Sequence, residues 1–426
     1  MVTTRLARSR VGAFVVVACA LLATHAPVSA QWILVPMDRV QANHLRAYGL
    51  TYWALEQQQR SEWLLNYRGG SFLLPDNPGI RREAALRGVT IEAMDASAEA
   101  RMRATIASSN MDAVPLERAP RIAIYSPPNA EIWDDAVTMA LEYAGISYET
   151  IWDPEVLSGG LSEYEWVHLH HEDFTGQYSK FFLTYGGTSW LQDEVDRNEE
   201  MAASVGAKNV PELKKRVAAA MRAYVEAGGF LFAMCSATET LELALAGADV
   251  DIAAEYADGT PPDPNASQLM DWSRAMAFQG AQVQIAPNVN AFSDIDAHQV
   301  NTPWRRELGA YTLFDFSAKF DPVPSMLTQN HVAVLPDFYG LTTSFSENRL
   351  KPATVVLASE GSWAKYLHGN LGEGTWTYFG GHDPEDPEHQ IGDPPTDLAS
   401  HPNSPGYRLI LNNVLFPAAK KQTLKT

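Results

Sequence analysis

The 426-residue chain has only two cysteines, Cys19 and Cys235. Beyond its first 30 positions it also lacks an uninterrupted apolar run of about 18 residues, which a membrane-spanning helix needs. Basic residues are few, since 32 Lys and Arg against 51 Asp and Glu give a formal net charge of −19. A surface of this charge repels phosphate backbones and anionic lipids, so we expect no nucleic-acid partner and no membrane span.

The first 30 residues have the layout of a secretory signal. Three arginines precede an apolar run over residues 11–23, and small residues precede a cleavage site after Ala30. We therefore expect residues 1–30 to be a signal peptide and the mature chain, starting at Gln31, to be periplasmic or secreted. Loss of the three arginines takes the formal charge from −19 to −22.

Cys19 offers an alternative processing route. Val-Val-Ala before it resembles a lipoprotein cleavage site, which would leave an acylated Cys19 as a membrane anchor. The residues after Cys19 stay apolar instead of forming a polar tether, which favours removal of the whole leader. The exported chain then holds a single thiol, Cys235, and cannot form an internal disulfide.

Apolar strand patterns alternate with helical patterns along the mature chain. This order predicts an α/β protein with a doubly wound, mainly parallel sheet. Strands are expected at 32–36, 63–67, 89–94, 122–125, 148–152, 166–170, 230–234, 332–335, 354–358 and 375–379, and helices at 80–87, 96–107, 132–144, 211–227, 238–246 and 407–416, with another around Leu45 to Glu56.

The β-α-β rhythm of the first part begins again at Arg121, and Ala-Leu-Glu recurs at 54–56 and 140–142. This suggests two mononucleotide-fold-like units in series. Residues 108–120 contain two prolines and are expected to form a linker. We therefore predict an N-terminal α/β unit over 31–115 and a larger α/β domain over 116–426. The larger domain carries an insertion near 256–290 and a long loop over 381–405.

Cys235 has the most specific local setting. The apolar strand 230–234 runs directly into it, a helix begins at once, and the small residues Ala233 and Ala237 flank it. This is the pattern of a nucleophile elbow, in which a sharp turn tolerates only small neighbours. We expect the helix N-terminus to lower the pKa of the thiol and the backbone N–H of Ser236 to serve an oxyanion.

His382 follows a later strand, after Gly380 and Gly381. A strand end at this edge is where open α/β sheets place their sites. The nearby acidic residues Asp383 and Glu385 could orient the imidazole as the third member of a triad.

A third group of polar residues surrounds the strand at 166–170. His168, His170 and Glu172 alternate along it, so they could project to one face and bind zinc. Imidazoles at a sheet edge more often line a polar pocket, and we expect this loop to lie beside Cys235 without a metal. The expected pocket residues are Ser236, His170, His171, Glu172, Thr175 and Gly176.

Cys235 on its turn and the Gly-Gly-His ending at His382 resemble the class I glutamine amidotransferase-like superfamily, in its trehalose-utilisation (ThuA-like) branch. The resemblance covers about residues 120 to 419. It implies a flavodoxin-like domain with Cys235 as nucleophile, His382 as base and Glu385 as orienter. Two residues separate His382 from Glu385, whereas the amidotransferases have one.

The overall sequence, from residues 31–36 to residues 404–413, is similar to exported bacterial proteins commonly labelled asparagine synthetase B. Glutamine-dependent asparagine synthetases use an N-terminal cysteine and a Ser-Gly-Gly-x-Asp-Ser loop that binds ATP. Here the mature chain would begin with Gln31, and the nearest loop, 158–162, lacks the aspartate. ATP-dependent synthesis is therefore not expected.

Together these features predict an exported Cys-dependent amide-processing hydrolase or amidotransferase-like enzyme without a cofactor, acting on a small-molecule or cell-envelope substrate. The alternative is a non-catalytic module that binds carbohydrate or a cell-envelope ligand on the same fold.

Overall fold

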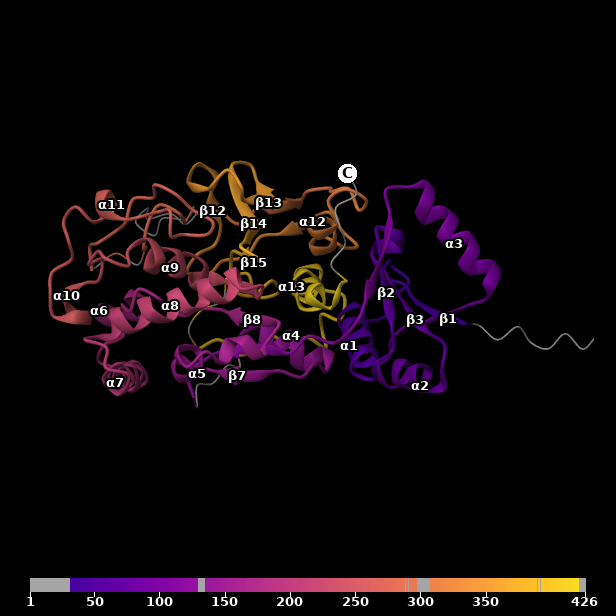
Figure 1. The fold of residues 1–426 in the computed structure, drawn as a ribbon, viewed down its shortest axis with the longest axis horizontal. Coiled ribbons are helices and arrows are strands. Elements are labelled where there is room, and N and C mark those ends of the chain that lie inside the picture. The colour runs from indigo at the N-terminus through magenta and orange to yellow at the C-terminus, as the bar shows by residue number, and fades with distance from the viewer. Residues whose placement is uncertain are drawn as a thin grey trace, which may run out of the picture.

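The computed structural model describes residues 31–420 except 129–134, 288, 290, 297–306, 389 and 391. The expected signal peptide, its cleavage site and Cys19 therefore lie outside the described residues. The molecule is elongated, with a small sheet from the N-terminal residues at one end and a larger sheet filling the rest (Figure 1).

The small sheet is antiparallel throughout, in the order β4-β1-β3-β2-β5. The expectation of a parallel mononucleotide-like unit here is wrong. Only residues 66–70 join β2 to β3, and so short a connection permits antiparallel pairing alone. The elements are β1 (Trp32–Val35), α1 (His44–Glu56), β2 (Ser61–Leu65), η1 (Tyr67–Gly69), β3 (Ser71–Pro75), α2 (Pro78–Arg87), β4 (Glu92–Met94), α3 (Ala96–Ser108) and β5 (Asp112–Leu116).

The segment 108–120 is not the linker that its prolines suggest, because its residues 112–116 form β5 at the edge of the small sheet. An edge strand tolerates Pro115, which has no N–H to offer a further strand. The carbonyl of Pro115 accepts the N–H of Lys420 at 2.8 Å, and Leu116 bridges to Ala419. The end of the described chain therefore covers part of this edge.

The large sheet is mixed. Among the described residues it has ten strands in the order β11-β10-β13-β14-β15-β9-β8-β6-β7, with β12 paired to β14. Strands β7, β6, β8, β9 and β15 are parallel, and the others pair antiparallel, so the sheet is not mainly parallel. A two-residue turn at Gly372 and Glu373 closes the β14–β15 hairpin, where the chain reverses direction.

The strands of this sheet are β6 (Ile122–Tyr125), β7 (Glu149–Ile151), β8 (Trp166–Leu169), β9 (Phe230–Met234), β10 (Ala310–Leu313), β11 (Val334–Pro336), β12 (Phe345–Ser346), β13 (Val355–Glu360), β14 (Trp363–Leu371) and β15 (Gly374–Phe379). Its helices are α4 (Ala136–Ala144), α5 (Asp153–Leu157), α6 (Phe182–Tyr185), α7 (Ser189–Ser204), α8 (Val210–Glu226), α9 (Cys235–Ala246), α10 (Glu255–Asp258), α11 (Ala266–Leu269), α12 (Pro322–Leu327) and α13 (Pro405–Leu415). Short 3₁₀ turns are η2 (Gly160–Glu163), η3 (Tyr178–Lys180), η4 (Glu347–Arg349) and η5 (Phe416–Ala418).

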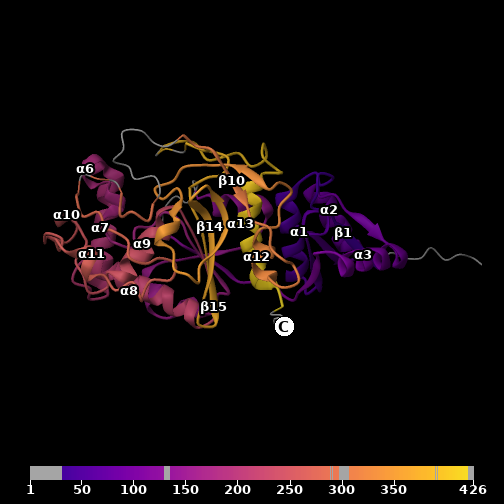
Figure 2. The ribbon, with the colours of Figure 1, turned by 90° about the horizontal axis from the view of Figure 1, so that it is seen from above.

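The central strands feed two hydrophobic cores, one on each face of the large sheet. In β9, Phe230, Phe232 and Met234 join one core, and Leu231 and Ala233 join the other. Side chains alternate along a strand, so continuously apolar strands such as this one are buried on both faces. Helices α8 and α9 lie on one side of the sheet and α13 on the other (Figure 2).

Helix α13 joins the two sheets, because it contacts both α1 and α4 (Figures 1 and 2). Its Arg408 is fully buried. The guanidinium donates to the carbonyl of Met37 at 2.8 Å, to that of Gly69, and to the hydroxyl of Tyr48 at 3.2 Å. A single side chain of the large domain therefore donates hydrogen bonds to backbone carbonyls of the N-terminal unit.

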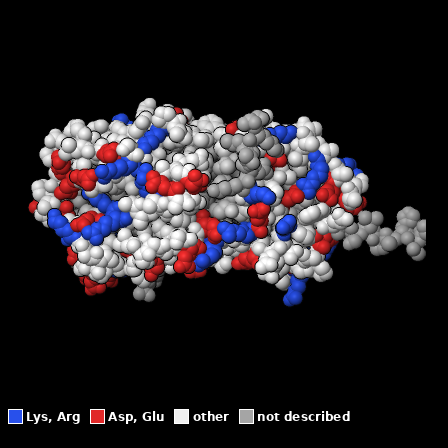
Figure 3. All heavy atoms as spheres, in the orientation of Figure 1, with Lys and Arg blue, Asp and Glu red and all other residues white. Residues whose placement is uncertain are grey.

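None of the described helices combines the length and apolar character needed to cross a membrane. On the face shown in Figure 3, Lys and Arg are interspersed with Asp and Glu instead of gathering into one basic patch.

Replacement of Arg408 by methionine should weaken the junction between the sheets. The buried carbonyl of Met37 and the partly buried carbonyl of Gly69 would lose their donor, which predicts a loss of about 2–4 kcal/mol in the free energy of unfolding. Urea denaturation followed by circular dichroism measures this, with Arg101→Met on the exposed face of α3 as the control. Equal midpoints for the two variants would contradict the role given to Arg408.

Candidate functional site

Three of the sequence-predicted residues meet at one edge of the large sheet. Strands β8, β9 and β15 are neighbours and run parallel, so their carboxyl ends point the same way. His170 follows β8 directly after Leu169, Cys235 follows β9, and His382 comes three residues after β15. Parallel pairing therefore brings together residues that are far apart in the sequence.

Cys235 adopts the sharp turn that the sequence predicts. It is the first residue of α9 and has a φ of 50°, in the left-handed region that residues with a Cβ avoid. Its N–H donates to the carbonyl of Gly381 at 3.2 Å, which ties the turn to the end of β15. Such a conformation costs about 1–3 kcal/mol and persists only where the surroundings enforce it.

The sulfur of Cys235 is buried, with the residue only 1% exposed. It accepts the N–H of Leu341 at 3.2 Å, from the segment 338–343 that covers it. Burial raises the pKa of the thiol to about 11, although the N–H groups of Leu341, Ser236 and Thr342 act in the opposite direction. The expected lowering of the pKa by the helix N-terminus is thus outweighed by desolvation, and the resting thiol is protonated.

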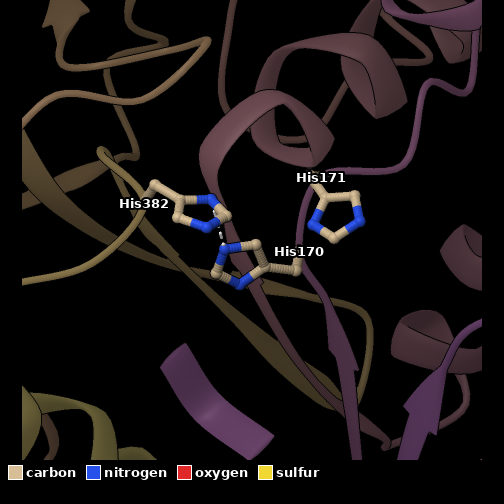
Figure 4. A group of neighbouring side chains, drawn as sticks. All are labelled: His170, His171 and His382. Atoms are coloured by element: carbon tan, nitrogen blue, oxygen red, sulfur yellow. Dashed lines mark hydrogen bonds between the residues drawn. The ribbon is translucent and has the colours of Figure 1, made fainter. Parts of the chain in front are cut away.

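His382 is hydrogen-bonded to another imidazole. Its Nδ1 and Nε2 of His170 are 2.9 Å apart, and the two rings are nearly perpendicular (Figure 4). His171 lies beside them, with its ring centroid 6.0 Å from that of His382. Burial, together with the neighbouring histidines, lowers the pKa of His170 well below its usual value, although Asp135 acts in the opposite direction.

The two carboxylates expected to orient His382 have other described partners. Asp383 accepts the N–H of Glu385 at 2.9 Å and the hydroxyl of Thr396 at 2.7 Å. Glu385 lies 3.0 Å from Nδ1 of His401. The hydrogen bond described for the His382 ring leads instead to His170.

The predicted pocket loop packs against α9. The hydroxyl of Ser236 donates to the carbonyl of His171 at 2.9 Å, and a carboxylate oxygen of Glu172 accepts the N–H of His170 at 2.9 Å. Thr175 donates its N–H to Asp173 at 2.8 Å, and a Cβ at Gly176 would collide with the backbone of Pro211. These contacts fix the course of the loop beside Cys235.

Asp135 is a site residue that the sequence reasoning missed. Its carboxylate oxygens lie 3.4 Å from Nε2 of His168 and 3.6 Å from Nδ1 of His170. Burial would raise the pKa of Asp135, but the two histidines lower it well below its usual value. Asp135 is the N-cap of α4, because it accepts the N–H groups of Val137 and Thr138. An aspartate before a helix is a recognisable sequence signal. The sequence pattern predicts that this helix begins at residue 132, which makes Asp135 an interior residue.

Two further buried groups hold the segment 338–343 over the sulfur. Lys365 donates to the carbonyls of Phe338 at 2.8 Å and Thr343 at 2.9 Å, and its Nζ lies 2.5 Å from Asp337. Glu239 accepts the hydroxyl of Thr342 at 3.0 Å, and burial raises the pKa of Glu239 to about 8. The cover of Cys235 is therefore anchored at both of its ends and at Thr342.

Comparisons with known proteins found only weak likenesses. No family model and no curated protein matches the chain. Among solved structures, it is similar to the cytoplasmic protein STM3548 from Salmonella typhimurium, with 11% identity over 71% of this chain and 100% of that one and a TM-score of 0.34. A ThuA-like protein from Bacteroides uniformis gives 12% identity over 69% and 90% of the two chains and a TM-score of 0.30. The GH42 β-galactosidase Gan42B gives 9% identity over 62% of this chain and 28% of that one, with a TM-score of 0.28.

The raised pKa predicts slow alkylation of Cys235 in the folded protein. A shift from 9.0 to about 11 lowers the thiolate fraction at pH 8 about 100-fold. Mass spectrometry of the Cys235 peptide after timed exposure to iodoacetamide should show reaction at least that much slower than in the urea-unfolded chain. The native rate should rise as the pH approaches 11, and equal rates at pH 8 would refute the burial.

Removal of the Lys365 anchor should expose the thiol. Lys365→Met frees the carbonyls of Phe338 and Thr343, so we expect alkylation of Cys235 at pH 8 to be about 10-fold faster than in the unchanged protein. Lys365→Met alone leaves Asp337 as a buried charge without its partner, which would destabilise the whole protein. The double variant Lys365→Met with Asp337→Asn removes that charge, so faster alkylation in it reports release of the segment 338–343. An exposed lysine, in Lys208→Met, serves as the control, and no gain in rate in either loop variant would contradict the anchoring.

Proposed function

We propose that the protein is a cysteine-dependent hydrolase of carboxamides or related acyl compounds, with Cys235 as its nucleophile. The observation that carries this proposal is the left-handed φ of 50° at a buried residue that is not glycine. Backbone strain of this kind gathers at functional sites, and in α/β hydrolases the same turn presents the nucleophile.

The backbone N–H groups beside the sulfur suit acyl transfer. Sγ attacks the carbonyl carbon, its proton passes to the imidazole of His382, and the tetrahedral oxyanion accepts backbone N–H groups. The N–H groups of Leu341 and Ser236 already act on the sulfur and are the candidate donors. The leaving amine takes the proton from His382, and water then releases the acid from the thioester.

A backbone contact supports this role for His382. Gly381, which precedes it, accepts the N–H of Cys235, and the ring of His382 is held by His170. We propose that His170, rather than Asp383 or Glu385, orients His382.

Access to the sulfur requires the segment 338–343 to move. The N–H of Leu341 is hydrogen-bonded to the sulfur, and the substrate carbonyl has to displace Leu341 from this position. We propose that this movement admits a small-molecule or cell-envelope amide, and that the protein meets it as a periplasmic or secreted chain.

We propose that part of the large sheet corresponds to a flavodoxin-like domain of the class I amidotransferase-like, ThuA-like kind. This part consists of the parallel strands β7, β6, β8, β9 and β15 and the turn at Cys235. The antiparallel strands β14, β13, β10 and β11 extend it beyond that pattern. ATP-dependent asparagine synthesis is not part of the proposal, because the sequence holds no matching ATP loop.

A second candidate function is favoured by the burial of the sulfur. With its thiol covered and protonated, the same fold could bind a carbohydrate or cell-envelope ligand without catalysis. In that case the turn at Cys235 is retained as architecture.

Loss of the thiol should abolish turnover. Across a panel of carboxamides, esters and thioesters, we expect Cys235→Ala to lower kcat/KM at least about 1,000-fold, because the covalent path is removed. Acid quenching and mass spectrometry should show an acyl adduct on the Cys235 peptide of the unchanged protein.

His368→Gln serves as the control, since His368 is buried in β14 and its Nδ1 donates to the carbonyl of Trp376, away from Cys235. Turnover that survives in Cys235→Ala would reject the cysteine mechanism. Ligand-induced thermal stabilisation that is equal in Cys235→Ala and the unchanged protein, with no turnover, would favour the binding function.

A further inference from the structure

Asp135, His168 and His170 form a buried cluster beneath the site edge. Their ligand atoms lie within 4.8 Å of one another, and each residue is at most 3% exposed. His168 belongs to β8, His170 follows it, and Asp135 precedes α4. The cluster is therefore held by secondary structure and not by a surface loop.

The tautomer of His168 is fixed by its outer partner. Its Nδ1 lies 3.0 Å from the carbonyl oxygen of Phe232, and because a carbonyl only accepts, this nitrogen carries a proton. In the neutral ring the lone pair is then on Nε2, which points at Asp135. An imidazole whose other nitrogen donates to a backbone carbonyl is the usual arrangement of a metal-binding histidine.

Within the part of the chain that the structure describes, the inner nitrogens of the cluster have no hydrogen-bond partner. Nε2 of His168 and Nδ1 of His170 are both buried and unsatisfied. Their distances to the Asp135 carboxylate, 3.4 and 3.6 Å, exceed the range of about 2.7–3.2 Å for an N–H···O bond. Around a tetrahedral zinc ion with bonds of about 2.0–2.1 Å, neighbouring ligand atoms are separated by about 3.4 Å.

Asp135 supplies the charge that a cation needs. One of its oxygens already accepts two backbone N–H groups, from Val137 and Thr138, so the carboxylate is held in place. A buried carboxylate that faces the lone pair on Nε2 of His168 is repelled by it unless a proton or a cation lies between.

We propose that Asp135, His168 and His170 bind a divalent cation, with tetrahedral zinc favoured by the spacing of their ligand atoms. Asp135 takes the place that the sequence suggested for Glu172, whose described carboxylate contact is with the N–H of His170. Three protein ligands leave a fourth position for water or a small ligand.

Binding is tested on the full protein without any activity measurement. After removal of metals with a chelator, we expect one equivalent of Zn²⁺ to bind by elemental analysis and to raise the Tm. Co²⁺ should give the visible absorption of a tetrahedral site. Asp135→Asn, which retains an N-cap side chain, and His168→Gln should each weaken binding at least about 100-fold.

Matched variants make the outcome specific. His368→Gln removes another buried histidine that contacts a backbone carbonyl, and it should bind Zn²⁺ as the unchanged protein does. The proposal is overturned if the unchanged protein binds no stoichiometric Zn²⁺ or Co²⁺. It is also overturned if His171→Gln abolishes binding while His168→Gln does not, because the ion would then lie among His170, His171 and His382.

The two proposals fail separately. Zinc binding with the expected variant pattern, in a protein whose Cys235→Ala variant shows unchanged turnover, supports the metal site and rejects the cysteine mechanism. Cysteine-dependent turnover in a protein that binds no Zn²⁺ or Co²⁺ supports the cysteine mechanism and rejects the metal site.

Discussion

The parallel pairing of β8, β9 and β15 is the constraint on which the site depends. It fixes three carboxyl ends at one edge, so that His170, Cys235 and His382 meet although more than 200 residues separate the first from the last. The turn at Cys235 then takes its strained form because the N–H of Cys235 is bonded to Gly381 beyond the neighbouring strand. Strand order thus sets both the members of the site and the conformation of its central residue.

Burial governs the chemistry of this edge. It keeps the Cys235 thiol protonated and raises the pKa of Glu239 to about 8, and each of these groups is held by hydrogen bonds from the covering segment. Lys365 stays buried because Asp337 and two carbonyls surround its ammonium group. Charges that are this far from water are stable only with such partners, so the cover is costly to rearrange.

Sequence reasoning succeeded where the signal was local and failed where it was not. The turn at Cys235 could be predicted because an apolar strand runs directly into a helix, and five strands of the large sheet do pair in parallel. Pairing direction in the rest of the sheets is set by connections and tertiary contacts, which periodicity does not encode, so the antiparallel strands were missed. Asp383 and Glu385 are near His382 in sequence, yet their described bonds lead elsewhere, whereas Asp135 reaches the histidines only through folding.

Helix α13 carries a consequence for the order in which the molecule is assembled. The ribosome makes its residues after every strand of both sheets, yet Arg408 saturates the carbonyls of Met37 and Gly69 near the start of the described chain. The small sheet can pair its own strands early, and α1 can pack against α4 as soon as both helices have been made. The carbonyls of Met37 and Gly69 gain the guanidinium of Arg408 only after α13 has been synthesised, so the junction between the sheets is complete only when this late helix docks.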